Sequence, residues 1–453
     1  MKPKKPCVLL YNPISGHGHL DSWLELFIEV LIKNEFRVLV ITPDSKALDN
    51  RLNHKGLGKH PFLQILSWKK ILSKQSYLRK TWDFWVYFGE RYYYNREGSQ
   101  ILDGMSFGMR IKKKFYQILV PFLFSISKYL RTCYRKIYPK SKDIEETGLD
   151  PMEFAIRVEY GIKKAKWKPD FLLNMYMDMY MTGLNSWNRF SSKCSLPWGG
   201  IRFVPMPEPI EGFYSLSSLR GMCFLDEKIS YVYSQKIPEK VFPFLPDITN
   251  TILPKNEPSI VQEMRHKANG RKIVFLGGSI GGQKNISRWC EVILLADPQK
   301  WFFLLIGEIH SDTFTKEDTE AFYFLLKKQP ENVFLFSEYI PDEGIFNALI
   351  KSSDIIFAVY RDFKLSSNML GKSAFLEKPI LVSDKYLMGE RVRDYKIGID
   401  VNENDSIAIL SALEQLGKLP IPSQNFANYR SIYNIQHLWS NIYPLIKFNQ
   451  KAF

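Results

Sequence analysis

The segment whose residue types best suit chemistry is a glycine-rich turn, Gly277-Gly-Ser-Ile-Gly-Gly-Gln-Lys-Asn285, between an apolar run and a helical pattern. Glycines let backbone N–H groups approach phosphate oxygens, and a helix N-terminus with Lys284 adds positive potential. The spacing matches neither a P-loop nor Gly-x-Gly-x-x-Gly. The turn predicts a phosphate site, with a tight turn that binds nothing as the alternative. The predicted contacts are Gly278, Ser279, Gly281, Gly282 and Lys284.

A second segment, Lys364-Leu-Ser-Ser-Asn-Met-Leu-Gly-Lys372, follows another apolar run. Ser366, Ser367 or Asn368 can cap the helix that begins there, so its free N–H groups face the carboxyl end of the sheet, where ligands bind. Lys372 lies in the first turns of this helix and could reach a diphosphate. A capped helix with a solvated lysine is the alternative.

Two candidates for acid–base chemistry lie in the first half. Ser15-Gly-His-Gly-His19 follows the first apolar run, and a histidine at that end of a strand is placed to act as general base for an acceptor hydroxyl. A structural cap or an acceptor-phosphate ligand is the alternative role for His19. Asp178, in a stretch rich in Met and Tyr, could orient an acceptor or act as a base, although such stretches are more often core.

Several other chemistries lack their signatures. The sequence contains no Asp-x-Asp pair, no His-Glu-x-x-His, no serine nucleophile elbow and no kinase signature, which favours chemistry without a bound metal. The five cysteines are scattered and never spaced as Cys-x-x-Cys. Neither a disulfide framework nor a zinc site is indicated, so we expect a cytoplasmic protein.

Short apolar runs alternate with helical patterns throughout the second half, which predicts a parallel sheet covered by helices on both faces. The predicted strands are 271–276, 301–306, 332–336, 354–359, 379–383 and 398–401. The predicted helices are 285–296, 343–351, 367–376, 388–394 and 406–416.

The first half begins with the same alternation. Its predicted strands are 8–10, 37–42, 170–174 and 201–204, with a helix at 21–33. Five prolines in 238–258 predict an extended interdomain linker, and 426–446 a last helix. We expect an N-terminal domain at 1–250, a C-terminal domain at 258–425 and a closing helix at 426–453.

The net charge of +15 is unevenly distributed. Residues 1–150 hold 26 Lys and Arg against 14 Asp and Glu, which favours an acidic partner. Within a helical insertion expected at about 60–150, Gly108–Lys142 holds ten basic and no acidic residues around an apolar, aromatic strip. The pattern fits a helix lying on an anionic membrane, or an insertion packed on the sheet with solvated charges.

Together these segments resemble the GT-B glycosyltransferases, particularly the family-4-like group. Gly307-Glu308 is similar to the group's Gly-acidic pair, and Glu338-Tyr-Ile-Pro-Asp-Glu343 to its G-x-V-P-x-E segment, whose backbone borders the nucleotide base. The resemblance implies two doubly wound Rossmann-like domains, α/β in class, facing across a cleft. It also implies a donor site in the C-terminal domain to which Lys284, Glu308 and Tyr339 contribute.

One departure from the family-4 pattern concerns the donor. Retaining members carry two glutamates eight residues apart before Lys-Pro, and Lys364 and Lys372 occupy those positions here. Ser279 replaces the usual donor-side arginine. A different donor, an inverting outcome or a loss of activity would each fit these replacements.

We therefore expect a metal-independent, hexosyltransferase-like enzyme that moves a sugar from a nucleotide diphosphate sugar to an acceptor on the N-terminal domain. No permanently bound cofactor is expected. The acceptor is a glycan, a lipid-linked molecule or a small molecule, and contact with the inner face of an anionic membrane is an open alternative. A non-catalytic GT-B protein that binds a nucleotide or glycan is the first rival. A nucleic-acid partner is not expected, because no nucleic-acid module is present.

Overall fold

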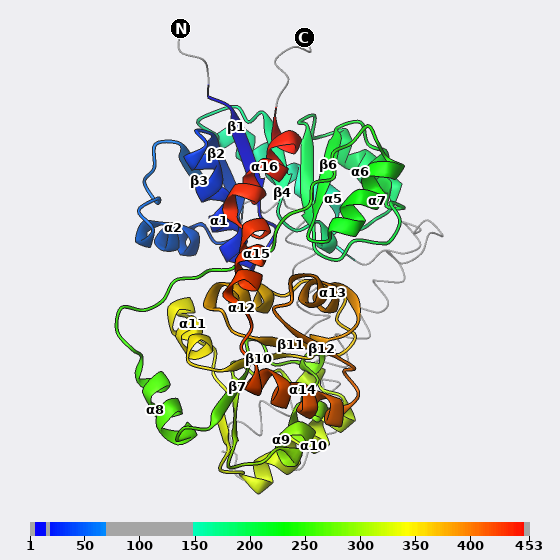
Figure 1. The fold of residues 1–453 in the computed structure, drawn as a ribbon. Coiled ribbons are helices and arrows are strands. Elements are labelled where there is room, and N and C mark those ends of the chain that lie inside the picture. The colour runs from blue at the N-terminus through cyan, green and yellow to red at the C-terminus, as the bar shows by residue number, and fades with distance from the viewer. Residues whose placement is uncertain (1–4, 15–18, 69–147, 448–453) are drawn as a thin grey trace, which may run out of the picture.

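The strands form two six-stranded parallel sheets in a computed structural model that describes residues 5–14, 19–68 and 148–447. The first sheet has the order β3-β2-β1-β4-β5-β6 and the second β12-β11-β10-β7-β8-β9 (Figure 1). The first comprises β1 (Cys7–Tyr11), β2 (Arg37–Thr42), β3 (Leu63–Ser67), β4 (Phe171–Asn174), β5 (Trp198–Arg202) and β6 (Leu219–Phe224). The second comprises β7 (Lys272–Gly277), β8 (Trp301–Ile306), β9 (Val333–Phe336), β10 (Ile355–Ala358), β11 (Ile380–Ser383) and β12 (Gly398–Val401).

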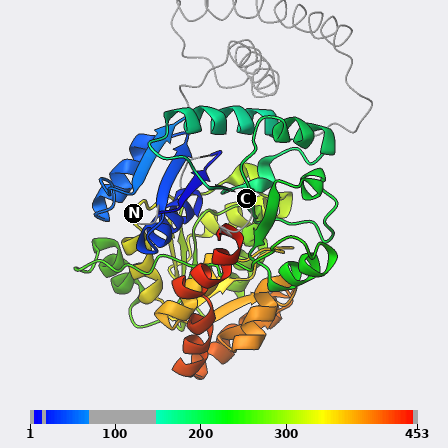
Figure 2. The same ribbon diagram turned by 90° about the horizontal axis from the view of Figure 1, so that it is seen from above.

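Helices cover both faces of the first sheet because alternate strand residues point to opposite sides. Val8 and Leu10 pack with helix α1 (His19–Lys33), whereas Leu9 packs with α5 (Pro151–Lys164) on the other face. Figure 2 shows α5 and α1 on opposite sides of these strands. The other helices of this part are α2 (Ser45–His54), α6 (Leu184–Ser191) and α7 (Glu227–Lys236).

The second sheet has the more continuous apolar strands. All six residues of β8 are buried, as expected for a central parallel strand with helices on both faces. The helices of this part are α8 (Ser259–Ala268), α9 (Ile286–Leu295), α10 (Lys316–Lys328), α11 (Glu343–Lys351), α12 (Asn368–Leu376), α13 (Tyr386–Tyr395) and α14 (Ser406–Lys418).

The last helical segment joins the two halves. It is α15 (Ser423–Ile432) and α16 (Ile435–Ile446), separated where Asn434 accepts hydrogen bonds from the Gln436 and His437 N–H groups and so caps α16. Phe426 and Tyr429 of α15 belong to the core of the second half, and residues of α16 to that of the first. The chain therefore crosses back to the first sheet, as the red helices of Figures 1 and 2 show.

A buried arginine also links the two halves. Arg391 of α13 donates to the Leu225 carbonyl at 2.6 Å, the Glu227 carboxylate at 3.0 Å and the Ser366 hydroxyl at 2.7 Å. Leu225 and Glu227 follow β6 of the first sheet, and Tyr433, the residue after α15, donates to the same Glu227 at 2.6 Å. This network fixes the second half against the first on the β6 side.

The predicted elements differ from the observed ones in several places. Strands β3 and β6 and helices α2, α5, α6, α7, α8 and α10 were not predicted, and the predicted strand 201–204 is instead β5 (Trp198–Arg202). It ends at Arg202 because the N–H groups of Phe203 and Val204 donate to the Asp178 carboxylate rather than to a neighbouring strand. The predicted helix 426–446 is two helices.

Most of the basic insertion predicted at 60–150 lies outside the described residues, as do Ser15 to Gly18. In the described part of the chain, no helix has both the length and the apolar character needed to cross a membrane.

Candidate functional site

The strand order places a switch point between β7 and β10. From β7 the chain continues through β8 and β9 on one side, then returns to β10 and continues to β12 on the other. In open parallel sheets the loops that leave two such strands border a crevice in which ligands bind. Here these loops are the glycine-rich turn after β7 and residues 359–367 after β10.

The glycine turn is tightly held to its neighbours. Gly278 has a φ of +100°, which favours glycine, and its N–H donates to the Ile306 carbonyl at 2.9 Å. The Gly282 N–H donates to the Thr313 hydroxyl at 2.9 Å. A Cβ at Gly282 would lie 2.3 Å from the Thr313 carbonyl oxygen, so only glycine fits there.

Two N–H groups of the turn remain available. The Ile280 N–H donates to the Glu308 carbonyl at 2.9 Å, and the Lys284 N–H to the Gly281 carbonyl. Within the described residues, the N–H groups of Ser279 and Gly281 have no hydrogen-bond acceptor. Alternate N–H groups of the turn are therefore left for a ligand such as a phosphate oxygen.

The Lys284 ammonium is held at this switch point. Its Nζ donates to the Tyr360 hydroxyl at 2.7 Å and lies 3.9 Å from the centre of that ring. Tyr360 is buried directly after β10, and its carbonyl accepts a hydrogen bond from the Ser383 hydroxyl of β11. The half-buried lysine from the β7 turn therefore rests on a fixed tyrosine from the β10 loop.

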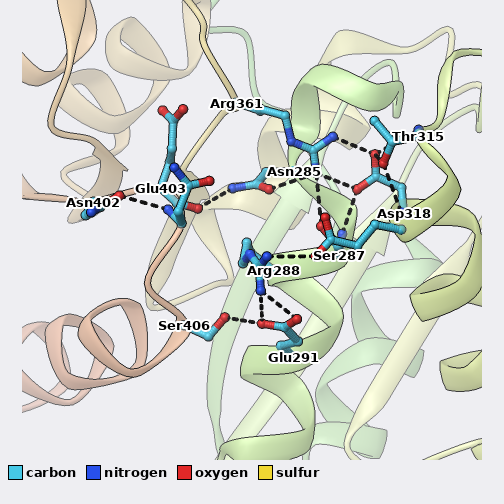
Figure 3. Close-up of polar contacts among 12 residues, drawn as sticks. Asn285, Ser287, Arg288, Glu291, Thr315, Asp318, Arg361, Asn402, Glu403 and Ser406 are labelled. Atoms are coloured by element: carbon cyan, nitrogen blue, oxygen red, sulfur yellow. Dashed lines mark hydrogen bonds and ion pairs between the residues drawn. The ribbon is translucent and has the colours of Figure 1, made fainter.

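An ion pair between Arg361 of the loop after β10 and Asp318 of α10 lies next to these loops (Figure 3). Both guanidinium NH2 nitrogens of Arg361 lie 2.7 Å from the Asp318 carboxylate oxygens. Arg361 also donates to the Ser287 hydroxyl at 2.9 Å and to the Asn285 side chain at 3.2 Å. Its backbone N–H donates to the Gln283 carbonyl at 2.9 Å. Arg361 thus joins the β10 loop to the glycine turn and the start of α9.

Asp318 is the centre of this network. It is fully buried and also accepts hydrogen bonds from the Ser287 N–H at 2.9 Å and from Thr315, with which it forms the capping box of α10. Burial alone would raise the pKa of this carboxyl, but the hydrogen bonds from Arg361, Ser287 and Thr315 outweigh it and lower the pKa. Asp318 is therefore ionised at neutral pH.

Asn285 extends the network to the far side of the sheet. It has a φ of +56°, it is buried, and its side-chain nitrogen donates to the Glu403 carbonyl at 2.7 Å. The Glu403 carboxylate accepts from the Asp362 N–H at 3.1 Å. Loops after β7, β10 and β12 are thus tied together by Asn285, Arg361 and Glu403 (Figure 3).

The remaining predicted donor residues lie around this edge. Glu308 is exposed after β8, 3.9 Å from the His310 ring nitrogen, and Tyr339 is partly exposed after β9. Ser367 caps α12 by accepting from the Met369 N–H, and Asn368 is the first residue of that helix. These positions follow β8, β9 and β10 on the carboxyl edge of the sheet.

Ser366 and Lys372 have protein partners instead. The Ser366 hydroxyl donates to Asp247 at 2.7 Å and accepts from Arg391. Lys372 is 1% exposed, and its Nζ donates to the Asn347 side chain at 2.5 Å and lies 3.3 Å from a Glu343 oxygen. In this arrangement Lys372 binds helix α11 rather than facing solvent.

The two predicted acid–base residues lie at the corresponding edge of the first sheet. His19 is the first residue of α1 after β1, and Asp178 lies in the loop after β4, the neighbour of β1. Asp178 accepts from the Phe203 N–H at 2.8 Å, the Val204 N–H at 2.9 Å and Arg202 at 3.4 Å. Its observed contacts are those of a residue that holds the loop after β5.

Sequence reasoning missed Tyr360, Arg361 and Asp318. Tyr360 and Arg361 follow the fourth predicted strand of the second half. Polar residues at the carboxyl end of a strand often line a ligand site, so their position could have indicated them. Thr315-Lys-Glu-Asp318 has the spacing of a capping box. Nothing in the sequence showed that Arg361 and Asp318 meet.

Candidate metal ligands do not gather anywhere in residues 5–14, 19–68 or 148–447: no group of three or more His, Cys, Asp or Glu could hold an ion there.

No family model matches the sequence, and no curated protein matches it. Solved structures do share the architecture. A glycosyltransferase from Rickettsia africae is 9% identical with a TM-score of 0.57, over 98% of this chain and 96% of that one. The trehalose-6-phosphate synthase of E. coli, bound with UDP-2-fluoro glucose, is 11% identical with a TM-score of 0.59, over 98% and 100%.

HepE of Anabaena, in complex with UDP and glucose, is 10% identical with a TM-score of 0.57, over 97% of this chain and 98% of that one. At such low identities the likeness establishes the fold. Two Rossmann-like domains are therefore common to this chain and these proteins.

Proposed function

The chain has the GT-B fold, and from this fold and the switch point between β7 and β10 we propose that it is a glycosyltransferase. In this proposal, residues 258–425 bind a nucleotide diphosphate sugar, and residues 1–250 bind the acceptor. We propose 426–453 as a closing segment, supported by its described residues, since those of α15 belong to the core of the second half and those of α16 to the core of the first.

The observation that carries the proposal is the setting of Lys284. A cation held on Tyr360, beside the available N–H groups of Ser279 and Gly281, is suited to the charge that develops on a departing diphosphate. Such preorganised charge often supplies the largest share of catalysis. HepE of Anabaena, which has the same fold, is known in complex with UDP and glucose.

The finer parts of the proposal follow from the same residues. Because Lys284 supplies the cation, we propose hexosyl transfer without a bound metal, so EDTA should leave turnover unchanged. His19 is the proposed acceptor base. The Glu308 and Tyr339 loops are proposed to border the nucleotide, and Ser367 and Asn368 the sugar or phosphates. We propose a cytoplasmic enzyme.

The test is a thermal-shift and calorimetric screen against UDP-, GDP-, ADP- and dTDP-sugars, since a ligand that binds only the folded state raises the melting temperature. We expect one donor class to bind, and Lys284→Ala to weaken it by about tenfold or more, roughly the effect of one charge-assisted contact. Lys300→Ala, at an exposed lysine paired with Asp297, is the matched control. A folded protein that binds no donor would contradict the proposal.

A second candidate is a nucleotide-sugar binding protein without turnover. The observation that favours it is Lys372, which stands where the resembling enzymes carry a glutamate and is buried against α11. Donor binding without donor hydrolysis or transfer would support this candidate over the first.

A further inference from the structure

The loops on the carboxyl edge of the second sheet carry five Lys, Arg and His side chains. Three of these have an acidic partner: His310 with Glu308, Arg361 with Asp318 and Lys385 with Glu403. The other two, Lys284 and Lys364, form no ion pair with any residue that the structure describes, and each lies over a tyrosine ring instead. Two lysines of this edge therefore keep their charge for an anion.

The ring beneath Lys364 is held in place. Lys364 is exposed in the loop after β10, and its Nζ lies 5.5 Å from the centre of the Tyr386 ring. The Tyr386 hydroxyl donates to the Asp362 carboxylate of the same loop at 2.6 Å. Tyr386 has a φ of +60°, a conformation that is unfavourable for a bulky residue and persists only where the surroundings impose it. Tyr386 thus supports Lys364 much as Tyr360 supports Lys284.

Helix α12 begins a few residues after Lys364 and offers backbone donors. Ser367 caps this helix by accepting a hydrogen bond from the Met369 N–H. The N–H groups of Ser367 and Asn368 have no acceptor in the part of the chain that the structure describes. Free N–H groups and the positive end of the helix dipole favour an anion at such a position. Lys364 and the start of α12 together form a second anion-binding position.

This position lies across the β10 loop from the glycine turn. Lys284 comes from the turn after β7 and rests on Tyr360, whereas Tyr386 begins α13 after β11. Strands β7 and β11 are the two neighbours of β10, so the two lysines approach its loop from opposite sides. The flexible four-carbon stem of an exposed lysine lets the Lys364 ammonium turn toward a ligand in the crevice. Two cation positions along one crevice match the two phosphates of a nucleotide diphosphate sugar.

We propose that Lys364 is a second cation for the donor diphosphate. One phosphate binds the glycine turn and Lys284, and the other binds the start of α12 and Lys364. This inference rests on the proposed transfer reaction and adds a residue that binds its donor. Lys364 would supply a positive charge that Ser279, in the place of the usual arginine, does not, and that the buried Lys372 cannot bring to the crevice.

The test measures binding of inorganic pyrophosphate, and of the UDP-, GDP-, ADP- and dTDP-sugars, to the full chain by calorimetry. Lys364→Gln removes the charge and keeps most of the side-chain length, so it should weaken binding of pyrophosphate and of the bound donor about tenfold. Lys385→Gln is the matched control, because it makes the same change of net charge on the next loop at a lysine that pairs with Glu403. It should bind as the native protein does. Both lysines are exposed, so folding should be retained.

Equal binding of pyrophosphate by Lys364→Gln and the native protein would overturn the inference, as would equal losses in Lys364→Gln and Lys385→Gln. A loss of nucleotide-sugar binding without a loss of pyrophosphate binding would place Lys364 on the sugar or the nucleoside, and the inference fails. It also fails if the native protein binds a nucleotide sugar but no pyrophosphate. Native protein that binds pyrophosphate through Lys364 but no nucleotide sugar would support the two-lysine site and count against the transfer reaction.

Discussion

The two switch points of this molecule differ in how they use polar groups. Behind the second, between β7 and β10, the charged side chains have partners: Arg361 pairs with Asp318, and Lys284 donates to the Tyr360 hydroxyl. At the first, between β1 and β4, Asn12 and Asn174 at the strand ends are buried neutral amides, and the buried charged pair Arg202–Glu211 lies farther along the sheet, beyond β5. Asn12 is fully buried, and no partner for its side chain lies in the described part of the chain.

This difference matches two kinds of ligand. At the second switch point, the network around Arg361 and Asp318 holds the loops in place and leaves the Lys284 ammonium to bind an anion. At the first, neutral amides beside the stacked Tyr176 and Phe203 rings suit a hydroxyl on a partly apolar molecule. The comparison predicts that removing a charge is costly at the second switch point and milder at the first.

The largest effect is expected from Asp318→Ala. It leaves Arg361 and the Ser287 N–H without their main partner, and we expect a loss of about 4 kcal/mol in the free energy of unfolding. Urea unfolding followed by circular dichroism measures it. The exposed Asp312→Ala is the control and should change stability by less than about 0.5 kcal/mol.

The same variant has a pH signature. Because the folded pKa of Asp318 is lowered, its contribution is present above the unfolded value of about 4 and is lost as the pH falls below it. The native protein should lose stability in that acid range more steeply than Asp318→Ala. If the free energies of unfolding of the native protein and of Asp318→Ala fell equally as the pH is lowered, the Asp318–Arg361 ion pair would not stabilise the fold as its geometry indicates.

A slightly smaller effect, about 3 kcal/mol, is expected from Arg391→Ala, which leaves Glu227 and the Leu225 carbonyl without this donor between the domains. In calorimetry, the two domains of the Arg391→Ala variant should unfold in two resolved transitions, whereas in the native protein their unfolding should be more closely coupled. A single unshifted transition would mean that α15 and α16 alone couple the two domains.

At the first switch point, Asp178→Ala should cost about 2 kcal/mol, because the Phe203 and Val204 N–H groups lose their shared acceptor. Donor binding should be unchanged, since Asp178 belongs to the other domain. If turnover vanishes while unfolding is unaffected, Asp178 acts as an acid–base residue rather than as a support for the loop after β5.

The smallest effect is expected from Lys372→Met, within about 1 kcal/mol at neutral pH, because Met fills the space of the lysine stem and the carboxylate left behind, Glu343, is 43% exposed and can be solvated. Burial lowers the pKa of Lys372, partly offset by Glu343. The unfolded state therefore holds more protons between the folded value and about 10.4, so this group makes stability rise with pH there. The variant should lack that rise, which unfolding at pH 8 and 10 would show.

Lys372→Met also tests which lysine contacts the donor. The buried position of Lys372 predicts little change in donor affinity, in contrast to Lys284→Ala. Equal losses in the two variants would place Lys372 on the donor diphosphate after all.

Features that depend on neighbouring residues along the chain could be predicted from the sequence. The alternation of apolar runs and helical patterns predicted parallel sheets, since a strand such as β8 is buried on both faces and must be apolar throughout. The glycine turn was predictable for the same reason, because its backbone geometry requires glycine at Gly278 and Gly282 themselves. The resemblance to GT-B proteins, confirmed as a fold, drew on these segments.

Only the tertiary structure decided which side chains meet. Arg361 and Asp318 are 43 residues apart, and Arg391 and Glu227 are 164 apart, so no local pattern pairs them. From the sequence, Lys372 was predicted to reach a diphosphate, with a solvated lysine as the alternative, yet the packing of α12 on α11 buries it. A sequence determines which backbone conformations and which buried faces are favourable, whereas the partner of a long polar side chain depends on where distant elements pack.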